Sequence, residues 1–161
     1  MAWYDFGMDV IVRKTDDVDA AFKVAQKLPD FFNAGGLKQI EEDTKRHILY
    51  GAYLDAELVG FATYKEINPD AVEMSWLAVL PEKQGLGVGA KLVNDSLNEL
   101  GSEYKVCEVK TLSETSSYEP YKKTRSFYKN IGFVPIETID PYPGWGEGNP
   151  CQIFVRFIGK I

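Results

Sequence analysis

Trp76-Leu77-Ala78-Val79-Leu80-Pro81-Glu82-Lys83-Gln84-Gly85-Leu86-Gly87-Val88-Gly89-Ala90 joins two elements of very different character. The segment begins inside the apolar run from Val72 to Leu80, which predicts a buried strand that ends at Pro81. After the glycines, apolar residues recur at helical spacing until Gly101, at Val88, Leu92, Val93, Leu97 and Leu100. The segment therefore predicts a strand, a glycine-rich turn and a helix in direct succession.

The three alternating glycines, Gly85, Gly87 and Gly89, predict an anion-binding turn. Without a Cβ atom, each lets the neighbouring backbone N–H groups point at one spot. The start of the following helix adds the positive end of its dipole. Glycine in a first helical turn costs up to about 1 kcal/mol relative to alanine. A tight connection that binds nothing is therefore a weaker explanation of the pattern than a ligand.

The same glycines partly match other phosphate-binding motifs. Gly85-x-Gly87-x-x-Ala90 fits the dinucleotide fingerprint, and Glu108 lies near the spacing of its ribose-binding acid. However, residues 81–84 separate the strand from the turn, and too few strand–helix units follow for a doubly wound sheet. A Walker loop is excluded because no Lys-Ser/Thr pair follows the glycines. An enzyme that binds a nicotinamide or flavin dinucleotide stays as the weaker alternative.

Around this segment the hydrophobic pattern predicts one α/β domain over residues 1–161. Apolar runs predict about seven strands, at residues 9–13, 48–54, 58–64, 72–80, 105–110, 133–139 and 151–158. We expect about four helices: one capped by Asp16, one after Gly35-Gly36, one after the glycine turn, and one from Pro120 to Gly132. Because antiparallel hairpins lead into two crossovers, the strands should form a central mixed β-sheet flanked by the helices.

The composition argues against several classes of protein. The 161 residues carry 18 Lys and Arg against 24 Asp and Glu, and a net charge of −6 does not suit a nucleic-acid partner. Cys107 and Cys151 lie far apart, and His47 is the only histidine. We therefore expect no metal site built from Cys and His ligands.

The chain also lacks the usual signals for export. Met1-Ala2-Trp3-Tyr4-Asp5 has neither the basic nor the apolar region of a signal peptide. No apolar run approaches the ~20 residues that a membrane span needs. Both cysteines lie in apolar runs and are expected to be buried thiols in a reducing compartment. We expect a cytoplasmic protein with no membrane partner, whose oligomeric state is open between a monomer and the common homodimer.

Three motifs of the chain resemble the GNAT superfamily of N-acetyltransferases. Gln84-Gly85-Leu86-Gly87-Val88-Gly89 matches the family's pyrophosphate motif, Gln/Arg-x-x-Gly-x-Gly/Ala. Residues 76–82 look like its central strand, and Phe127-Tyr128-Lys129-Asn130-Ile131-Gly132-Phe133 looks like its late Tyr-x-x-x-Gly-Phe helix. The order of elements agrees up to about residue 158. The resemblance implies a GNAT-like fold, acetyl-CoA as cofactor, and transfer of its acetyl group to an amine.

The resemblance also implies roles for main-chain groups. The pantetheine arm of acetyl-CoA would pair with the backbone of Leu77, Ala78 and Val79 like an added strand. The N–H group of Val79 would donate to the thioester oxygen. The pyrophosphate would be held by Gln84, Gly85, Leu86, Gly87, Val88, Gly89 and Ala90.

Two side chains are implied in proton transfer. Tyr128 matches the family's late tyrosine, a cofactor contact and the general acid for the CoA thiolate. Glu73 lies where some members carry a catalytic glutamate, and it would act as the general base, directly or through a water. A base is needed because an alkylamine titrates near 10. Their plain alternatives are a core tyrosine and an ion-paired carboxylate at a strand end. Many members also carry an asparagine about seven residues before the tyrosine, where this chain has Tyr121.

Side chains outside the motifs give weaker indications. The basic residues that open the late helix are expected to face solvent rather than a cofactor phosphate: Lys122, Lys123 and Arg125. Aromatic residues in loops near a cleft often shape an acceptor pocket: here Tyr118, Tyr142 and Trp145. The acceptor is expected to be a small molecule or a peptide that carries a primary amine. A non-catalytic acyl-CoA-binding or regulatory module of the same fold is the alternative function.

Overall fold

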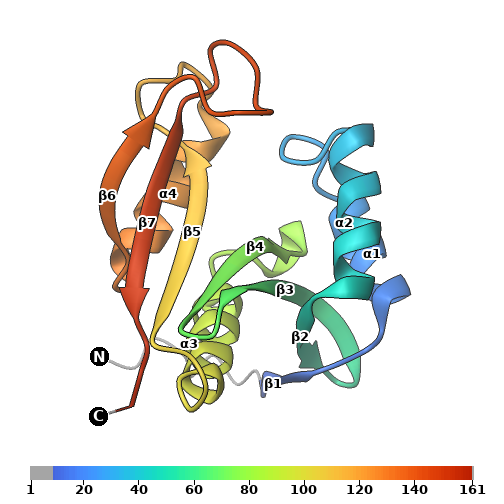
Figure 1. Ribbon diagram of the computed structural model, residues 1–161. Coiled ribbons are helices and arrows are strands. Elements are labelled where there is room, and N and C mark those ends of the chain that lie inside the picture. Colours follow the sequence, from blue (N-terminus) through green and yellow to red (C-terminus); the bar gives the residue numbers. More distant parts are fainter. Residues whose placement is uncertain (1–8, 161) are drawn as a thin grey trace.

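The computed structural model describes residues 9–160, which form a seven-stranded sheet of order β1-β2-β3-β4-β5-β7-β6 (Figure 1). The strands are β1 (Ile11–Lys14), β2 (Ile48–Leu54), β3 (Glu57–Asn68), β4 (Ala71–Val79), β5 (Val106–Leu112), β6 (Val134–Ile139) and β7 (Cys151–Phe157). The helices of this range are α1 (Val18–Gln26), α2 (Ala34–Arg46), α3 (Val88–Leu100) and α4 (Pro120–Asn130), with a 3₁₀ turn η1 (Pro81–Lys83) before α3. The predicted mixed sheet with seven strands and four helices is confirmed. Residues 1–5, on which the expectation about export rested, lie outside the described range.

β2 and β3 form the predicted antiparallel hairpin around a two-residue turn. Asp55 and Ala56 take positive φ angles of 49° and 66°. Two-residue turns in which both residues have positive φ match the right-handed twist of the strands that they join. Residues 58–64 of β3 are buried without a break, so both faces of the sheet are covered at its centre.

Different helices cover the two faces. On one face, the hydroxyl of Tyr64 lies 2.6 Å from Ser96 Oγ of α3. Because side chains alternate along a strand, Thr63 and its β4 partner Trp76 face the other way. There the Trp76 indole donates a hydrogen bond to Asp43 of α2, and α1 packs against α2 and β3. We call these two sides the α3 face and the α2 face.

β4 and β5 separate soon after they meet. They pair in parallel over three positions, the last of which joins Glu73 to Glu108. Two residues further on, Ser75 has no partner in β3, since Met74 and Trp76 pair with consecutive β3 residues. Such a bulge bends a strand and increases its twist, and Figure 1 shows β4 diverging from β5. The bulge also puts Glu73 and Trp76 on the same face, because their β3 partners are two residues apart.

Two details of the predicted helices are wrong. Asp17 caps α1 in place of Asp16, because its carboxylate accepts a hydrogen bond from the first-turn N–H of residue 20. α2 starts earlier than expected, at Ala34, so that Gly35-Gly36 lie in its first turn rather than before it. Asn33 makes this start possible, because its side chain accepts the N–H of residue 36.

The sheet topology contradicts the dinucleotide alternative. Within residues 9–160, only β4 and β5 pair in parallel, and the other neighbouring strands are antiparallel. A doubly wound parallel sheet is therefore not formed. Glu108, the candidate ribose ligand, forms an ion pair with Lys110 instead.

Over this same range, no helix combines the length and the apolar character needed to cross a membrane.

Candidate active site

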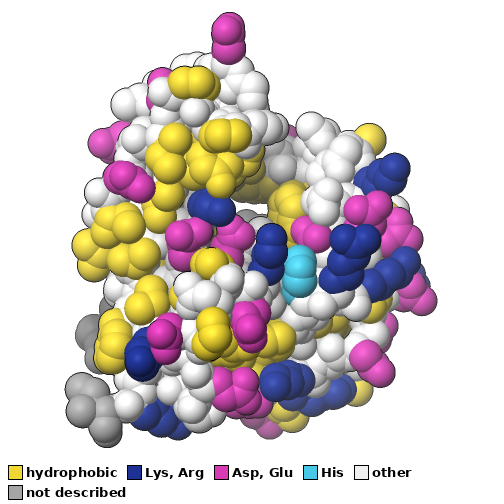
Figure 2. Space-filling view, in the orientation of Figure 1, with side chains coloured by type: hydrophobic (Ala, Val, Ile, Leu, Met, Phe, Trp, Pro, Cys, Tyr) yellow, Lys and Arg dark blue, Asp and Glu magenta, His cyan; other side chains and the backbone are white. Residues whose placement is uncertain are grey.

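A cleft of about 1480 Å³ opens where β4 and β5 diverge. Its 33 lining residues come from β4, β5, α2, α4, the turn before α3 and the start of that helix, and the α1–α2, β5–α4 and β6–β7 loops. Figure 2 shows a hollow at the centre of one face of the molecule, with hydrophobic side chains gathered above it and charged side chains below it. Pockets for one small ligand typically measure about 300–1,000 Å³, so this cleft has room for two reactants.

The N-terminus of α3 opens onto the cleft without a side-chain cap. Gly87 is its N-cap, with a φ of 83° that favours glycine, and no side chain accepts the first-turn amides. The first helical hydrogen bond runs from Lys91 N to Gly87 O at 3.0 Å, which leaves the N–H groups of Val88, Gly89 and Ala90 without a helical acceptor. In contrast, side chains cap both α1 and α2. The start of α3 is thus suited to hold an anion.

β4 offers further main-chain donors along its free edge. Leu80 N donates to Val59 O of β3 at 2.9 Å. Because bonded and non-bonded positions alternate along an antiparallel pair, the N–H groups of Leu77 and Val79 point away from β3. β5 does not pair with β4 there, so these two donors are open to a ligand. The side chain of Gln84 donates to Val79 O at 3.0 Å and holds the turn against the strand.

Tyr128 and Thr111 face this part of the cleft from the α3 face. Tyr128 is 7% exposed and packs against the rings of Phe127, Phe133 and Phe154. Burial raises the pKa of its hydroxyl well above the ordinary value, so the group is protonated at neutral pH. Thr111 lines the cleft with a buried hydroxyl that has no hydrogen-bond partner. A buried unpaired hydroxyl is unfavourable, and a polar ligand in the cleft would satisfy it.

Glu73 lies on the α2 face as part of a charged cluster. Lys110 Nζ is 2.9 Å from Glu73 Oε1 and 3.4 Å from Glu108 Oε1. Burial lowers the pKa of Lys110, but hydrogen bonds to Tyr142 and Glu73 and the nearby carboxylate charges outweigh burial and raise it. The lysine is therefore positively charged at neutral pH. Sequence reasoning missed Lys110, although its alternation with Glu108 along an apolar strand places both on one face.

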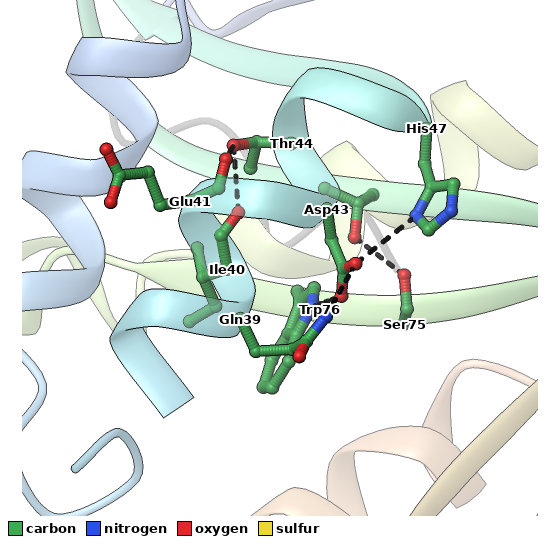
Figure 3. Close-up of polar contacts among 9 residues, drawn as sticks. Gln39, Ile40, Glu41, Asp43, Thr44, His47, Ser75 and Trp76 are labelled. Atoms are coloured by element: carbon green, nitrogen blue, oxygen red, sulfur yellow. Dashed lines mark hydrogen bonds and ion pairs between the residues drawn. The ribbon is translucent and has the colours of Figure 1, made fainter. Parts of the chain in front are cut away.

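Asp43 of α2 is a second carboxylate at the cleft, besides Glu73, and the sequence did not predict it (Figure 3). Its Oδ2 accepts a 2.7 Å hydrogen bond from the Trp76 indole, and its Oδ1 accepts a 3.0 Å bond from Gln39. His47 Nδ1 lies 4.0 Å from the same carboxylate. Asp43 thus fixes the Trp76 ring at the α2 face of the cleft. No sequence signal pointed to this contact, because it depends on how α2 packs across β4.

The structure brings most of the predicted site residues to this one cleft. Those that line it are Glu73, Leu77, Ala78, Val79, Gln84, Gly85, Gly87, Gly89, Ala90 and Tyr128. Leu86 and Val88 are not among the lining residues, and the Val88 side chain is buried in the core. Glu73 and Tyr128 approach the free edge of β4 from opposite faces. A carboxylate and a protonated phenol thus lie on opposite faces of the same strand.

The tyrosines before and at the start of α4 connect the two sides of the cleft. The Tyr118 hydroxyl donates a hydrogen bond to the carbonyl of Asp30 in the α1–α2 loop. The Tyr121 ring packs edge-on against Phe31, with centroids 5.4 Å apart. Tyr121, at the position where the resemblance implies an asparagine, is therefore part of an aromatic contact across the cleft.

The basic residues of α4 have separate surroundings. Arg125 Nη1 donates to Leu112 O at 2.8 Å and ties the helix to β5. Lys123 lines the cleft, whereas Lys122 lines a separate hollow of about 320 Å³. Of the three, Lys123 is the one placed to meet a ligand of the cleft.

Both cysteines are free and buried, and neither is among the residues that line the cleft. Burial raises the pKa of Cys107 to about 12 and that of Cys151 to about 11. Because the thiolate is the nucleophile, neither residue is suited to accept an acyl group. Neither cysteine therefore provides a nucleophile in the cleft.

Comparison with solved structures shows the same fold in acetyltransferases. A protein from Desulfovibrio desulfuricans assigned to the GNAT family is 19% identical, with a TM-score of 0.80 over 94% of this chain and 100% of that one. An aminoglycoside 6′-N-acetyltransferase complexed with coenzyme A is 20% identical, with a TM-score of 0.72 over 94% and 98%. The ribosomal-protein-S18-alanine N-acetyltransferase of Escherichia coli is 17% identical, with a TM-score of 0.70 over 96% of both chains.

Sequence comparison gives the family directly. No curated protein matches the chain. The sequence profile of the acetyltransferase (GNAT) domain, however, matches residues 45–135, which is more than half of the chain and includes both diverging strands, the glycine turn and α4. On this match and on the shared fold, the chain belongs to the GNAT family of acetyltransferases.

Proposed function

We propose that the chain is an acetyl-CoA-dependent N-acetyltransferase in which a primary amine attacks the thioester directly. One observation carries the proposal: the cleft brings together the uncapped start of α3 and the open edge of β4. The first suits a diphosphate, and the second suits an extended arm with amide groups, which can add to a strand edge. The unpaired Thr111 hydroxyl adds a polar contact beside them.

Acetyl-CoA supplies the acetyl group as a reactive thioester. The amides of Val88, Gly89 and Ala90 would hold its diphosphate, and the N–H groups of Leu77 and Val79 would align its arm. In this position the Val79 N–H would stabilise the negative charge that develops on the carbonyl oxygen.

Two side chains would move protons on either side of this edge. Glu73 would accept a proton from the acceptor's ammonium group, directly or through a water, on the α2 face. Tyr128 would donate a proton to the leaving thiolate on the α3 face. Its buried hydroxyl keeps that proton at neutral pH, because burial raises its pKa. Since the cysteines are free, we place this reaction in a reducing compartment, the cytoplasm.

The test is a screen of purified protein with acetyl-CoA and amines of several classes, read out by free thiol release. Acceptor-dependent thiol release that is lost in Tyr128→Phe would support the proposal. A protein that binds acetyl-CoA but releases no thiol with any amine would contradict it and favour a non-catalytic acyl-CoA-binding module.

A further inference from the structure

Aromatic side chains are concentrated in the cleft. Nine of its 33 lining residues are aromatic, about twice the 13% of the whole chain. Some of these belong to the α3 face or bridge the two sides. Four others line the cleft on the α2 face, the side of Glu73, and we call them the aromatic wall: Phe32, Trp76, Tyr142 and Trp145.

The contacts of the aromatic wall place its members beside the charged cluster. Phe32 packs edge-on against Trp76, with ring centroids 5.8 Å apart, on the side of α2. Tyr142 and Trp145 of the β6–β7 loop contact each other at 5.0 Å. The Lys110 ammonium lies 5.5 Å from the Tyr142 ring and 2.9 Å from the Glu73 carboxylate. Two aromatic pairs from distant parts of the chain thus border the candidate base.

The charge at this end of the cleft is small. Lys110 contacts both Glu73 and Glu108, so the cluster carries about one net negative charge. Asp43 adds a second negative charge, since its donors Trp76 and Gln39 are neutral, but each of its oxygens already accepts one hydrogen bond. A polyamine carries several ammonium groups, whereas the carboxylates of this end are already engaged by Lys110, Trp76 and Gln39. One ammonium group, however, complements one negative charge beside aromatic faces.

We propose that the acceptor is a monocationic amine carried on an aromatic body, an arylalkylamine whose ring contacts the aromatic wall. Aromatic pairs are worth more than their buried area alone. In the reaction, the N–C bond to the acetyl carbonyl forms and the C–S bond breaks. Of the two protons that the ammonium loses, one is balanced by the proton gained by the thiol and one enters solvent. This inference rests on the proposed acetyltransferase function.

The test compares kcat/KM, from thiol release, for 2-phenylethylamine, n-butylamine, spermidine and a tripeptide with a free N-terminus. We expect kcat/KM for 2-phenylethylamine to exceed that for n-butylamine by at least about tenfold. The values for spermidine and the tripeptide should also lie below that for 2-phenylethylamine. A preference for n-butylamine, spermidine or the peptide would overturn this inference but leave the acetyltransferase function intact. No thiol release with any acceptor would overturn both.

Two variants of the wall separate its role from folding. Trp145→Ala and Phe32→Leu should raise KM for 2-phenylethylamine about tenfold, with little change in KM for acetyl-CoA or n-butylamine. Phe157→Ala is the matched control, because this exposed aromatic residue lies on β7 outside the cleft; its kinetics should be unchanged. Equal loss of activity toward both amines in the two wall variants would contradict ring recognition.

Discussion

Tyr128 has a buried ring and lines the cleft, and both properties suit the general acid that we propose it to be. Its three aromatic neighbours hold the ring, and the hydroxyl is the group that differs from phenylalanine. We expect Tyr128→Phe to lower kcat at least about tenfold, because a general acid contributes about 10²–10⁴-fold. KM for acetyl-CoA should change little. Thiol release under saturating acetyl-CoA measures both values.

The control for this variant is Tyr104→Phe, which also removes the hydroxyl of a tyrosine whose ring is buried. Tyr104 donates its hydrogen bond to Glu66 and lies outside the cleft. Full activity of a folded Tyr128→Phe protein would rule out the acid role.

Glu73 is expected to act together with the lysine beside it. Glu73→Gln keeps the shape and a hydrogen bond to Lys110, but it cannot take up a proton at neutral pH. We expect kcat/KM to fall at least about tenfold and the pH–rate profile to lose the limb that depends on the base. Rates measured over a range of pH test this. An unchanged profile would remove Glu73 from the mechanism, and Glu66→Gln, an exposed carboxylate outside the cleft, is the control.

At the scale of elements, the turn before α3 predicts opposite effects for two alanine substitutions. Gly87 has a φ of 83°, where a Cβ atom costs about 1–2 kcal/mol. Gly89 is helical, and a Cβ atom there would meet the Phe127 ring at an ordinary 3.5 Å. Gly87→Ala should therefore destabilise the protein, whereas Gly89→Ala should stabilise it by up to about 1 kcal/mol. Urea unfolding measures both, and shifts in the same direction would contradict this account of the turn.

The elements themselves could largely be predicted from the sequence. Hydrophobic period and glycines indicated β4, the turn and α3, since these are local properties of residues 72–101. The divergence of β4 and β5 could not be predicted, because it depends on the Ser75 bulge and on a register between strands about 35 residues apart. The contacts of Lys110 with Glu73 and of Asp43 with Trp76 were missed for the same reason.

At the scale of the whole molecule, buried tyrosines predict sensitivity to alkali. Burial raises the pKa of Tyr64 and Tyr128 above the ordinary value near 10. Because the pKa of each tyrosine is higher in the folded than in the unfolded protein, its stabilising effect is complete below pH 10. The effect is lost as the pH rises from 10 toward the folded-state pKa. Each such tyrosine should lower the free energy of unfolding by about 1.4 kcal/mol per pH unit there. Urea unfolding at pH 8 and pH 11 measures this, and equal stability at both would contradict it.

The central claim is that main-chain amides of one cleft hold acetyl-CoA, and amide NMR spectra of the 161-residue chain during a titration with acetyl-CoA test it most directly. We predict saturable shifts of the Leu77, Val79, Val88, Gly89 and Ala90 amides, with the amides of the capped α1 start unmoved. Acetyl-pantetheine, which lacks the diphosphate, should move the β4 amides and leave those of α3 in place. Saturable binding that leaves both groups of amides unshifted, or no binding by folded protein, would contradict the account.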